Sequence, residues 1–388
     1  MTKKARVIAF YLPQFHPIPE NDKWWGKGFT EWTNVGKAKP LFKGHYQPRV
    51  PADLGYYDLR MPEVREAQAE MARGAGIEGF CYWHYWFGNG KELLERPFNE
   101  VVDSGKPDFP FCLGWANHDW ETKTWTATKV THKGTMIAEM QYPGEEDYIL
   151  HFNKYLKAFK DPRYIKVDGK LLFTVYEPNK MPDAPQWIKC WNQLAKENNL
   201  NGFHFVGVCK NFRVTDAETG KLKLSRIKSL KNSAKLLFNE VFDRGFDAVN
   251  SRGANRANVL ASGNFYLHYF RRFLMKCGVK VILRSDYKDI IRHFYIEDDR
   301  QENVYPTITP NLDRSPRSGS NTSLIWHNST PELFGEMIDK ALSMIEYKQP
   351  EHKILFLHSW NEWGEGNYME PDLKYGRGYL NVLKEKIL

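Results

Sequence analysis

The sequence contains no apolar run that approaches the roughly 18 residues of a membrane-spanning helix. The apolar run near the basic N-terminus, Val7–Leu12, is ended by Pro13 and is too short for the core of a signal peptide, so we expect a buried strand there. No Pro- or Ser-rich linker, low-complexity tract or internal repeat divides the chain. We therefore expect a cytoplasmic protein whose residues 1–388 form a single domain.

Cysteine is scarce and irregularly spaced. The five cysteines are odd in number and lie mostly inside apolar runs, which indicates buried thiols of a reducing compartment rather than a disulfide framework. They are Cys81, Cys112, Cys190, Cys209 and Cys277. No Cys/His spacing of a zinc site and no H-E-x-x-H motif is present. We expect neither a metal nor another cofactor.

Charge is not concentrated in a way that indicates a nucleic-acid partner. The net charge is +8, from 55 basic and 47 acidic residues, and no zinc-finger, RNP or basic-zipper motif accompanies it. The acidic run Glu297–Asp299 and the basic run Lys221–Lys235 are expected to be solvated surface. We interpret Phe265–Leu283, which mixes aromatic residues with Arg and Lys, as a barrel helix, and leave open a peripheral contact with a membrane surface.

Short β-rich runs alternate with helical patterns along the chain, as in a parallel sheet wrapped by helices. Eight strands are expected, the number that closes an α/β fold of the (β/α)8 TIM-barrel type. They are Arg6–Tyr11, Gly79–Trp83, Phe111–Trp115, Leu171–Tyr176, Phe203–Val208, Ala248–Asn250, Val304–Ile308 and Ile354–Ser359. Helices are expected at Pro62–Ala75, Asp147–Phe159, Pro185–Asn198 and Pro331–Tyr347, the last with Thr330 as its N-cap.

A doubly wound α/β sheet is the main competing architecture. Such a sheet would carry a glycine-rich turn after its first strand, whereas Pro13–Pro17 follows here. We therefore favour a barrel with long βα-loop insertions. The long insertions, residues 116–146 and 209–246, lie on the strand-to-helix side, where barrel active sites form. The stretch Pro310–Asn321, rich in Ser, Arg and Pro, is expected to be a mobile loop.

Two glutamates after the last strand are the candidate catalytic residues. Glu362 and Glu365 lie in the segment His358–Pro371, and on a helical turn their spacing sets Cβ atoms roughly 5–6 Å apart. Carboxyl pairs at about that separation act on glycosidic bonds with retention. Solvated acids that cap a helix would be the simpler interpretation, but the strand end, the spacing and the aromatic neighbours together favour catalysis.

Aromatic residues are abundant and gather at other strand ends. They make up 15% of the sequence, with 13 Trp and 20 Tyr. Sugar rings stack on aromatic planes and their hydroxyls bond Asn, His and Asp, so this mixture suits a glycan cleft; packing beneath the barrel mouth would also explain Trp83 and Trp86. The candidate substrate-binding residues are Tyr11, His16, Trp83, His84, Trp86, Trp115, Asn117, His118, Tyr176, Asn361, Trp363 and Glu370.

At these residues the sequence resembles the WbsX-type proteins, a family grouped with the glycoside hydrolase family 99-like enzymes. The resemblance runs from Ala9–His16 to Glu370–Pro371. The segments Trp24–Val35 and Trp115–His118 are specific to the WbsX group, and Asn361–Gly366 is shared with the wider hydrolase family. The resemblance implies a (β/α)8 barrel with endo-mannosidase-like chemistry on glycans.

The resemblance also implies a role for each glutamate. In the hydrolase family the first Glu of the E-x-x-E motif acts as base on the neighbouring sugar 2-hydroxyl, and the second acts as general acid and then base. A 1,2-anhydro sugar intermediate gives net retention. These roles carry over to Glu362 and Glu365 respectively. Gly364 stands where the hydrolases usually carry His, a departure that bears on the substrate and on the reaction direction.

Three functions are compatible with these features. The first is a glycosidase-like enzyme acting on an oligosaccharide or polysaccharide, such as a bacterial surface polysaccharide or its precursors. The second is a glycosyltransferase of lipopolysaccharide, O-antigen or capsule biosynthesis, since WbsX-type proteins occur with surface-polysaccharide assembly genes. The third is a non-catalytic glycan-binding barrel, which would not need both Glu362 and Glu365.

Overall fold

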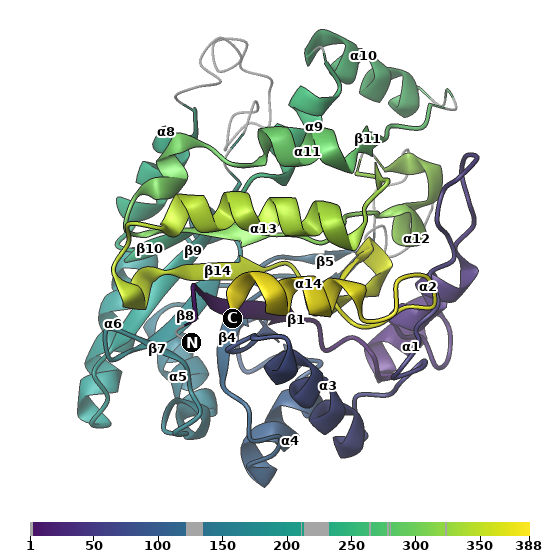
Figure 1. The fold of residues 1–388 in the computed structure, drawn as a ribbon. Helices are drawn as coiled ribbons and strands as arrows, with labels where there is room; N and C mark the ends of the chain where they lie inside the picture. Colours follow the sequence, from purple (N-terminus) through teal and green to yellow (C-terminus); the bar gives the residue numbers. More distant parts are fainter. Residues whose placement is uncertain are drawn as a thin grey trace.

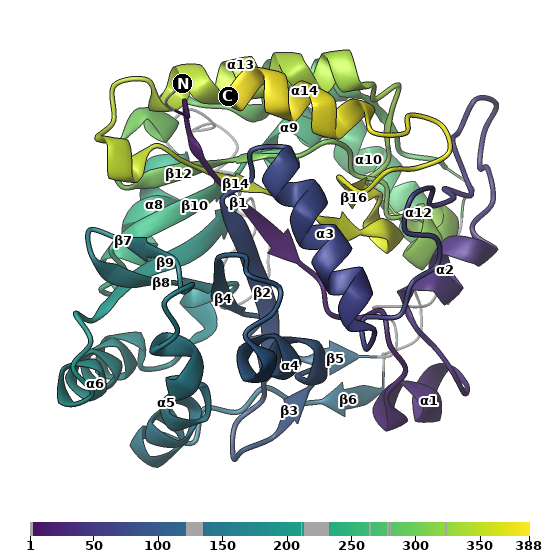
Figure 2. The same cartoon turned by 60° about the horizontal axis from the view of Figure 1, so that its bottom comes forward.

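The computed structural model describes residues 3–121, 135–210, 212, 233–263, 265–277, 279, 281–322 and 324–388. Eight parallel strands form a closed barrel (Figure 1; Figure 2). Strand β1 closes it by pairing with β2 on one side and β14 on the other, so that Ala9 lies opposite both Phe80 and Leu357. The (β/α)8 TIM-barrel fold expected from the sequence is confirmed. The strands are β1 Arg6–Tyr11, β2 Gly79–Trp86, β4 Phe111–Trp115, β8 Lys170–Val175, β9 Phe203–Lys210, β10 Ala248–Arg252, β12 Val304–Ile308 and β14 Ile354–Leu357.

The barrel strands are buried on both faces, which explains why their sequences are continuous apolar runs. Every residue of β12 and β14 is buried. Side chains on one face of each strand fill the barrel interior, and those on the other pack beneath the helices. Strand β2 continues three residues past the end expected at Trp83, because Tyr85 and Trp86 pair with the short antiparallel strand β3, Glu92–Leu93.

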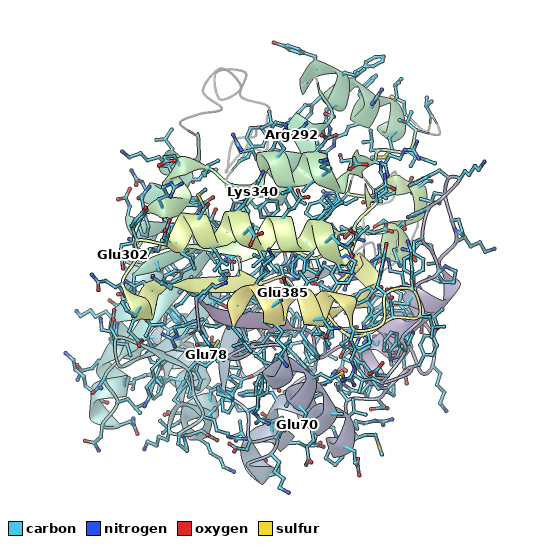
Figure 3. The ribbon with its side chains drawn as sticks, viewed as in Figure 1. Glu70, Glu78, Arg292, Glu302, Lys340 and Glu385 are labelled. Carbon is cyan, nitrogen blue, oxygen red and sulfur yellow. The ribbon has the colours of Figure 1, made fainter. Side chains whose placement is uncertain are left out.

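Amphipathic helices cover the outside of the barrel (Figure 1). Helix α13, Pro331–Ile345, begins after Thr330, whose hydroxyl accepts the N–H of Leu333 at 3.3 Å as the expected N-cap. Charged side chains such as Lys340 and Glu385 lie on the solvent-facing sides of their helices (Figure 3). The other covering helices are α3 Pro62–Gly74, α4 Arg96–Ser104, α5 Glu145–Phe159, α6 Ala184–Glu197, α8 Ser233–Phe242, α11 Tyr287–Phe294 and α14 Gly378–Ile387.

The helices in the segment that follows β10 differ from those expected. Two helices, α9 Ala254–Ala261 and α10 Phe265–Lys276, precede α11, and α11 is the one that lies beside α13 (Figure 1). Helix α10 projects from the molecule and leaves Tyr266 and Phe270 mostly exposed. The interpretation of Phe265–Leu283 as a barrel helix is therefore wrong. A contact of this stretch with a membrane surface stays a prediction.

Two smaller expectations, on the cysteines and on the acidic run Glu297–Asp299, differ in part from the structure. Cys277 is exposed, whereas the other four cysteines are buried as expected. Asp299 is buried rather than solvated, because its carboxylate accepts the N–H of Ile296 at 2.9 Å and so caps a short 3-10 helix. The basic run Lys221–Lys235 lies almost wholly outside the described residues. No helix in the described part of the chain is long and apolar enough to cross a membrane.

Candidate active site

The carboxyl ends of the barrel strands surround a cleft of about 470 Å³. Trp83 of β2, Arg252 of β10 and Thr307 of β12 line it, together with residues of the loops that follow the strands. This is the end of the barrel at which the sequence places the site. The volume falls within the range of about 300–1,000 Å³ that is usual for clefts binding small molecules.

Glu362 and Glu365 both line this cleft, from the loop that follows β14 (residues 358–371, the closing loop). The short strands β15, Asn361–Glu362, and β16, Asn367–Tyr368, pair antiparallel and hold a single 3-10 turn between them. Arg317 Nη1 lies 3.2 Å from Glu362 Oε1 and 2.5 Å from Glu365 Oε1. Both oxygens contact the same nitrogen, so the two carboxyl groups lie close together. This is compatible with the separation of about 5–5.5 Å between the carboxyl groups of retaining glycosidases.

A third glutamate, Glu31, binds the other side of the same guanidinium. It is the first residue of α2, Glu31–Lys37, and is fully buried. Its carboxylate lies 2.6 Å from Arg317 Nη2 and 3.2 Å from Arg317 Nε, in a bidentate pair. Arg317 belongs to the short helix α12, Ser315–Ser318, within the stretch expected to be a mobile loop. Part of the stretch is thus helical and carries buried ion pairs, and its expected mobility stays a prediction.

Gly364 makes room for Glu31. A Cβ atom on Gly364 would lie 1.8 Å from Glu31 Oε1, far inside van der Waals contact. Gly364→Ala is therefore expected to destabilise the fold by about 1–3 kcal/mol, because the buried carboxylate would have to move away from Arg317. Urea unfolding measures this change. Gly36→Ala is the matched control, since a Cβ on Gly36 meets nothing within 4 Å. Equal stabilities for the two variants would refute this packing argument.

The charges around Glu362 keep it ionised. Burial by itself would raise the pKa of Glu362, but a hydrogen bond from His358 and the positive charge of Arg317 outweigh burial and lower the pKa to about 2. His358 Nε2 lies 3.4 Å from Glu362 Oε2. Burial raises the pKa of Glu31, against the opposing charge of Arg317. Glu362 is thus ionised, the form in which a carboxylate can accept a proton.

A half-buried arginine of the cleft, Arg252, contacts several aromatic rings. The Arg252 guanidinium carbon lies 4.9 Å from the ring centroid of Phe10 and 5.5 Å from that of Tyr176. Trp83 stacks on Phe10 with centroids 4.6 Å apart. Arg252 Nε and Nη2 are buried and have no hydrogen-bond partner within the described part of the chain. These contacts keep a cation beside the carboxylate pair without an ion pair to either glutamate.

Three of the candidate substrate-binding residues, Trp83, His118 and Tyr176, line the cleft together with Glu362 and Glu365. The other candidates do not line it. They are buried side chains that contact other protein groups: Tyr11, His16, His84, Trp86, Trp115, Asn117, Asn361, Trp363 and Glu370.

Several of the buried candidates contact one another or neighbouring side chains. His84 Nε2 lies 2.9 Å from His151 Nε2, and Trp86 stacks on the His151 ring with centroids 4.7 Å apart. Trp115 donates its indole N–H to the carbonyl oxygen of Trp86 at 2.9 Å. Tyr11 donates its hydroxyl to Gln68 at 2.6 Å. These contacts indicate packing roles that support the lining residues.

Two asparagines tie active-site loops to neighbouring chain segments. The Asn361 side chain accepts the N–H of Leu12 at 2.8 Å and donates to the Leu12 carbonyl at 3.0 Å. Asn117 makes the same pair of bonds with Glu177, at 2.7 and 3.0 Å. Each amide thus replaces a backbone partner, so that Asn361 anchors the closing loop to the end of β1.

Glu370 is a buried carboxyl behind the closing loop. It accepts hydrogen bonds from Trp363 Nε1 at 2.6 Å, Gln68 Nε2 at 2.6 Å and Tyr57 Oη at 2.9 Å. Burial nevertheless raises its pKa to about 7, from 4.5. The folded protein therefore holds this proton more tightly than the unfolded chain does.

The raised pKa of Glu370 predicts a pH dependence of stability. The free energy of unfolding should fall by about 3 kcal/mol as the pH rises from about 4.5 through 7. Urea titrations at several pH values measure this slope. The Glu370→Gln variant should lose that component of the slope, whatever its absolute stability. A variant with an unchanged slope would exclude Glu370 as its origin.

Sequence reasoning missed Glu31, Arg252 and Arg317. Glu31 stands in a Trp-rich segment with no sign of its partner, and Arg317 stands in a polar stretch that looks solvent-exposed. Their importance becomes visible only when segments 286 positions apart meet. Among the described residues, no group of three or more His, Cys, Asp or Glu side chains has the arrangement of a metal site.

Comparisons with known proteins give a family and a set of similar folds. The family model described as "Glycosyltransferase WbsX" matches residues 7–383. A curated relative, "Uncharacterized protein WxcX" of Xanthomonas campestris pv. campestris, is 31% identical over 392 residues; the match covers 100% of this chain and 50% of the relative. The chain thus spans about half the length of the curated relatives it matches.

Solved structures share the barrel. One, a "Glycoside hydrolase-like protein", has a TM-score of 0.60 at 16% identity, and the match covers 100% of this chain and 94% of that one. The GH99 endo-alpha-mannosidase from Bacteroides thetaiotaomicron has a TM-score of 0.56 at 14% identity, with 100% and 97% covered. At such identities these likenesses establish the fold.

Proposed function

Because the chain belongs to the glycosyltransferase WbsX family of carbohydrate-active enzymes, we propose that its cleft makes or cleaves glycosidic bonds by a retaining two-carboxylate reaction, with glycosidase-like hydrolysis as the leading direction. One observation carries the proposal: a single guanidinium, Arg317, holds Glu362 and Glu365 side by side in the cleft. The substrate in this proposal is an oligosaccharide or polysaccharide, such as a bacterial surface polysaccharide or its precursor.

In the proposed reaction the two glutamates have different tasks. Glu362 takes the proton of the sugar 2-hydroxyl, whose oxygen attacks the anomeric carbon, while Glu365 gives a proton to the departing glycosidic oxygen. The resulting 1,2-anhydro sugar is opened by water, which Glu365 deprotonates, and Glu362 returns its proton to the 2-oxygen. The ionised state of Glu362 supports the base role. Two displacements at the same carbon leave its configuration retained.

A glycosyltransferase is the second candidate, and the family description favours it. The same carboxylates would serve if a sugar hydroxyl replaced water in the second step, as in assembly of lipopolysaccharide, O-antigen or capsule. A glycan-binding barrel without activity is the third candidate. It has less support, because such a protein would not need both carboxylates on one arginine.

Product analysis by NMR tests the proposal. Purified protein is incubated with oligosaccharides, with and without sugar nucleotides. We expect release of a reducing sugar whose anomeric configuration is retained. Growth of the chain only when a sugar nucleotide is present would establish the transferase instead. Inverted product would exclude the retaining reaction, and saturable binding of an oligosaccharide with no product in either arm would favour the binding barrel.

A further inference from the structure

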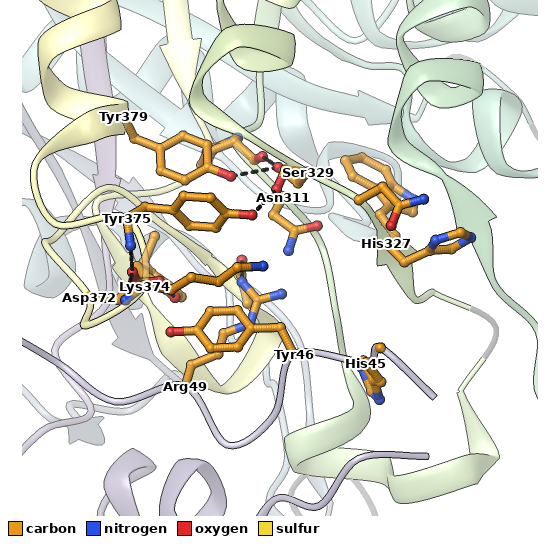
Figure 4. A pocket seen from close by; sticks show the side chains of 16 residues that line it. His45, Tyr46, Arg49, Asn311, His327, Ser329, Asp372, Lys374, Tyr375 and Tyr379 are labelled. Carbon is orange, nitrogen blue, oxygen red and sulfur yellow. Dashed lines mark hydrogen bonds between the residues drawn. The ribbon is translucent and has the colours of Figure 1, made fainter. Parts of the chain in front are cut away.

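A second cavity, of about 60 Å³, lies behind the closing loop (Figure 4). Gly366 and Tyr368 of that loop line it, whereas Glu365 lines the cleft, so the closing loop separates the two spaces. We call it the rear cavity. It is large enough for one small chemical group, such as a carboxylate, rather than for a whole sugar ring.

Hydrogen-bond donors converge on the rear cavity. Arg49, Asn311 and Lys374 point into the same space from three different chain segments (Figure 4). Arg49 is 6% exposed, and its Nε is buried without a hydrogen-bond partner in the described part of the chain. The indole nitrogen of Trp326, which also lines the cavity, is buried and likewise without an acceptor there. Buried donors left without acceptors are costly, so a ligand that supplies acceptors would be stabilised here.

The two carboxylates near these donors, Asp372 in the cavity lining and Asp313 beside Arg49, are already hydrogen-bonded to other groups. Asp313 accepts from His45 Nε2 at 2.8 Å and from Gln47 Nε2 at 2.7 Å, and Arg49 Nη2 lies 3.8 Å from it. Asp372 accepts from Tyr368 Oη at 2.6 Å and from the backbone N–H groups of Lys374 and Tyr375 at 2.9 and 2.7 Å. Both acids are therefore already engaged by donors of the protein.

Lys374 is held by aromatic rings instead of by an acid. Its ammonium lies 4.7 Å from the ring centroid of Tyr46 and 4.6 Å from that of Tyr375, and no carboxylate of the described residues forms an ion pair with it. Cation–π contact positions the ammonium while leaving its N–H donors available. Lys374 can thus hydrogen-bond a guest in the rear cavity.

We propose that the rear cavity binds a singly charged oxyanion, either the carboxylate of an acidic sugar or a phosphodiester group. Charge-assisted bonds from Arg49 and Lys374 and a neutral bond from Asn311 would hold it. A singly charged group suits the site because it supplies acceptors to these donors and is repelled less by Asp313 and Asp372 than a doubly charged group would be. This proposal concerns binding and does not depend on the reaction proposed for the cleft.

The bound anion would contact the residue that supports the closing loop. Arg49 Nη1 donates to the carbonyl oxygen of Gly366 at 3.0 Å, and the backbone N–H of Asp313 donates to that of Glu365 at 2.6 Å. An anion bound to Arg49 would therefore contact a side chain that hydrogen-bonds Gly366, the residue immediately after Glu365. The rear cavity is placed to recognise an acidic part of a glycan, or a separate effector, beside the carboxylate pair.

Isothermal titration calorimetry with glucuronate, dimethyl phosphate and neutral methyl glucoside tests the proposal on the full chain. We expect saturable binding of glucuronate or dimethyl phosphate, and none of methyl glucoside at the same concentration. Saturation by one anion alone would identify the source of the group. Lys374→Met should weaken binding about tenfold. Lys384→Met, an exposed lysine of α14, should leave it unchanged.

Arg252→Met distinguishes the rear cavity from the cleft, where Arg252 could also attract an anion. Binding that persists in Arg252→Met and weakens in Lys374→Met supports the rear cavity. Binding that is lost in Arg252→Met and retained in Lys374→Met would overturn it, as would the absence of saturable binding of either anion. Since no turnover is needed, this result is independent of the outcome of the product analysis.

Discussion

Replacing Glu365 by Gln is expected to lower turnover of a natural glycan by about 10²–10⁴-fold, the usual contribution of a general acid. Gln has the shape of Glu and leaves Arg317 in place, but it cannot donate a proton to a departing oxygen or take one from water. Folding and glycan binding should remain close to those of the unchanged protein. Initial rates and calorimetric binding measure the two effects separately. Glu385→Gln, on the exposed face of α14, is the matched control.

A substrate with an activated leaving group separates proton donation from a structural role. A nitrophenolate departs without protonation, so the first step with a nitrophenyl glycoside should be much less affected by Glu365→Gln than the same step with a natural glycan. Near-normal turnover of the natural glycan by the Gln variant would show that Glu365 is not the acid. An equal loss for both substrates would point to a positional role.

Replacing Arg317 by Met is expected to have the largest effect on stability. The change leaves Glu31 buried and unpaired and leaves Glu362 and Glu365 facing one another without their shared cation. Removing one partner from a buried ion pair costs about 3–5 kcal/mol. Urea unfolding should show a loss of this size. The control Arg292→Met, at an exposed pair with Asp289, should cost at most about 1 kcal/mol.

A double variant keeps the argument testable if Arg317→Met folds poorly. Glu31→Gln with Arg317→Met removes the buried charge together with its partner, and should recover much of the lost stability. It should not recover turnover, because the carboxylate pair still lacks the group that holds it. Recovery of turnover would show that Arg317 serves only to neutralise Glu31. A double variant as unstable as Arg317→Met would contradict the ion-pair account.

Much of the barrel could be predicted because each strand carries its own signal. The predicted bounds of the first, third and seventh strands are the observed ones, since a parallel strand buried on both faces is a nearly continuous apolar run. Phe265–Leu283 was misassigned for a related reason. A helix with aromatic residues looks like a covering helix, and only the position of α11 shows that the covering place is taken.

In the site, too, residues with a local sequence signal could be predicted, and residues whose role depends on distant segments could not. Glu362 and Glu365 could be found because they lie close together after a recognisable strand. The sequence predicts that Tyr11 and Trp86 bind substrate, but the residue type does not say whether an aromatic ring faces a cleft or packs behind it. Arg317 was missed because polar residues predict exposure. Its burial depends on acids contributed by α2 and the closing loop.

The space left by Gly364 has a consequence for related chains. The carboxylate of Glu31, from α2, fills this space. A side chain at position 364 and a carboxylate in the place of Glu31 therefore exclude each other. A relative with any side chain at the position of Gly364 cannot also keep a carboxylate in the place of Glu31. These two positions should therefore covary across the family, and the pair of residues found there should sort its members into those whose arginine is shared by three acids and those whose arginine is shared by two.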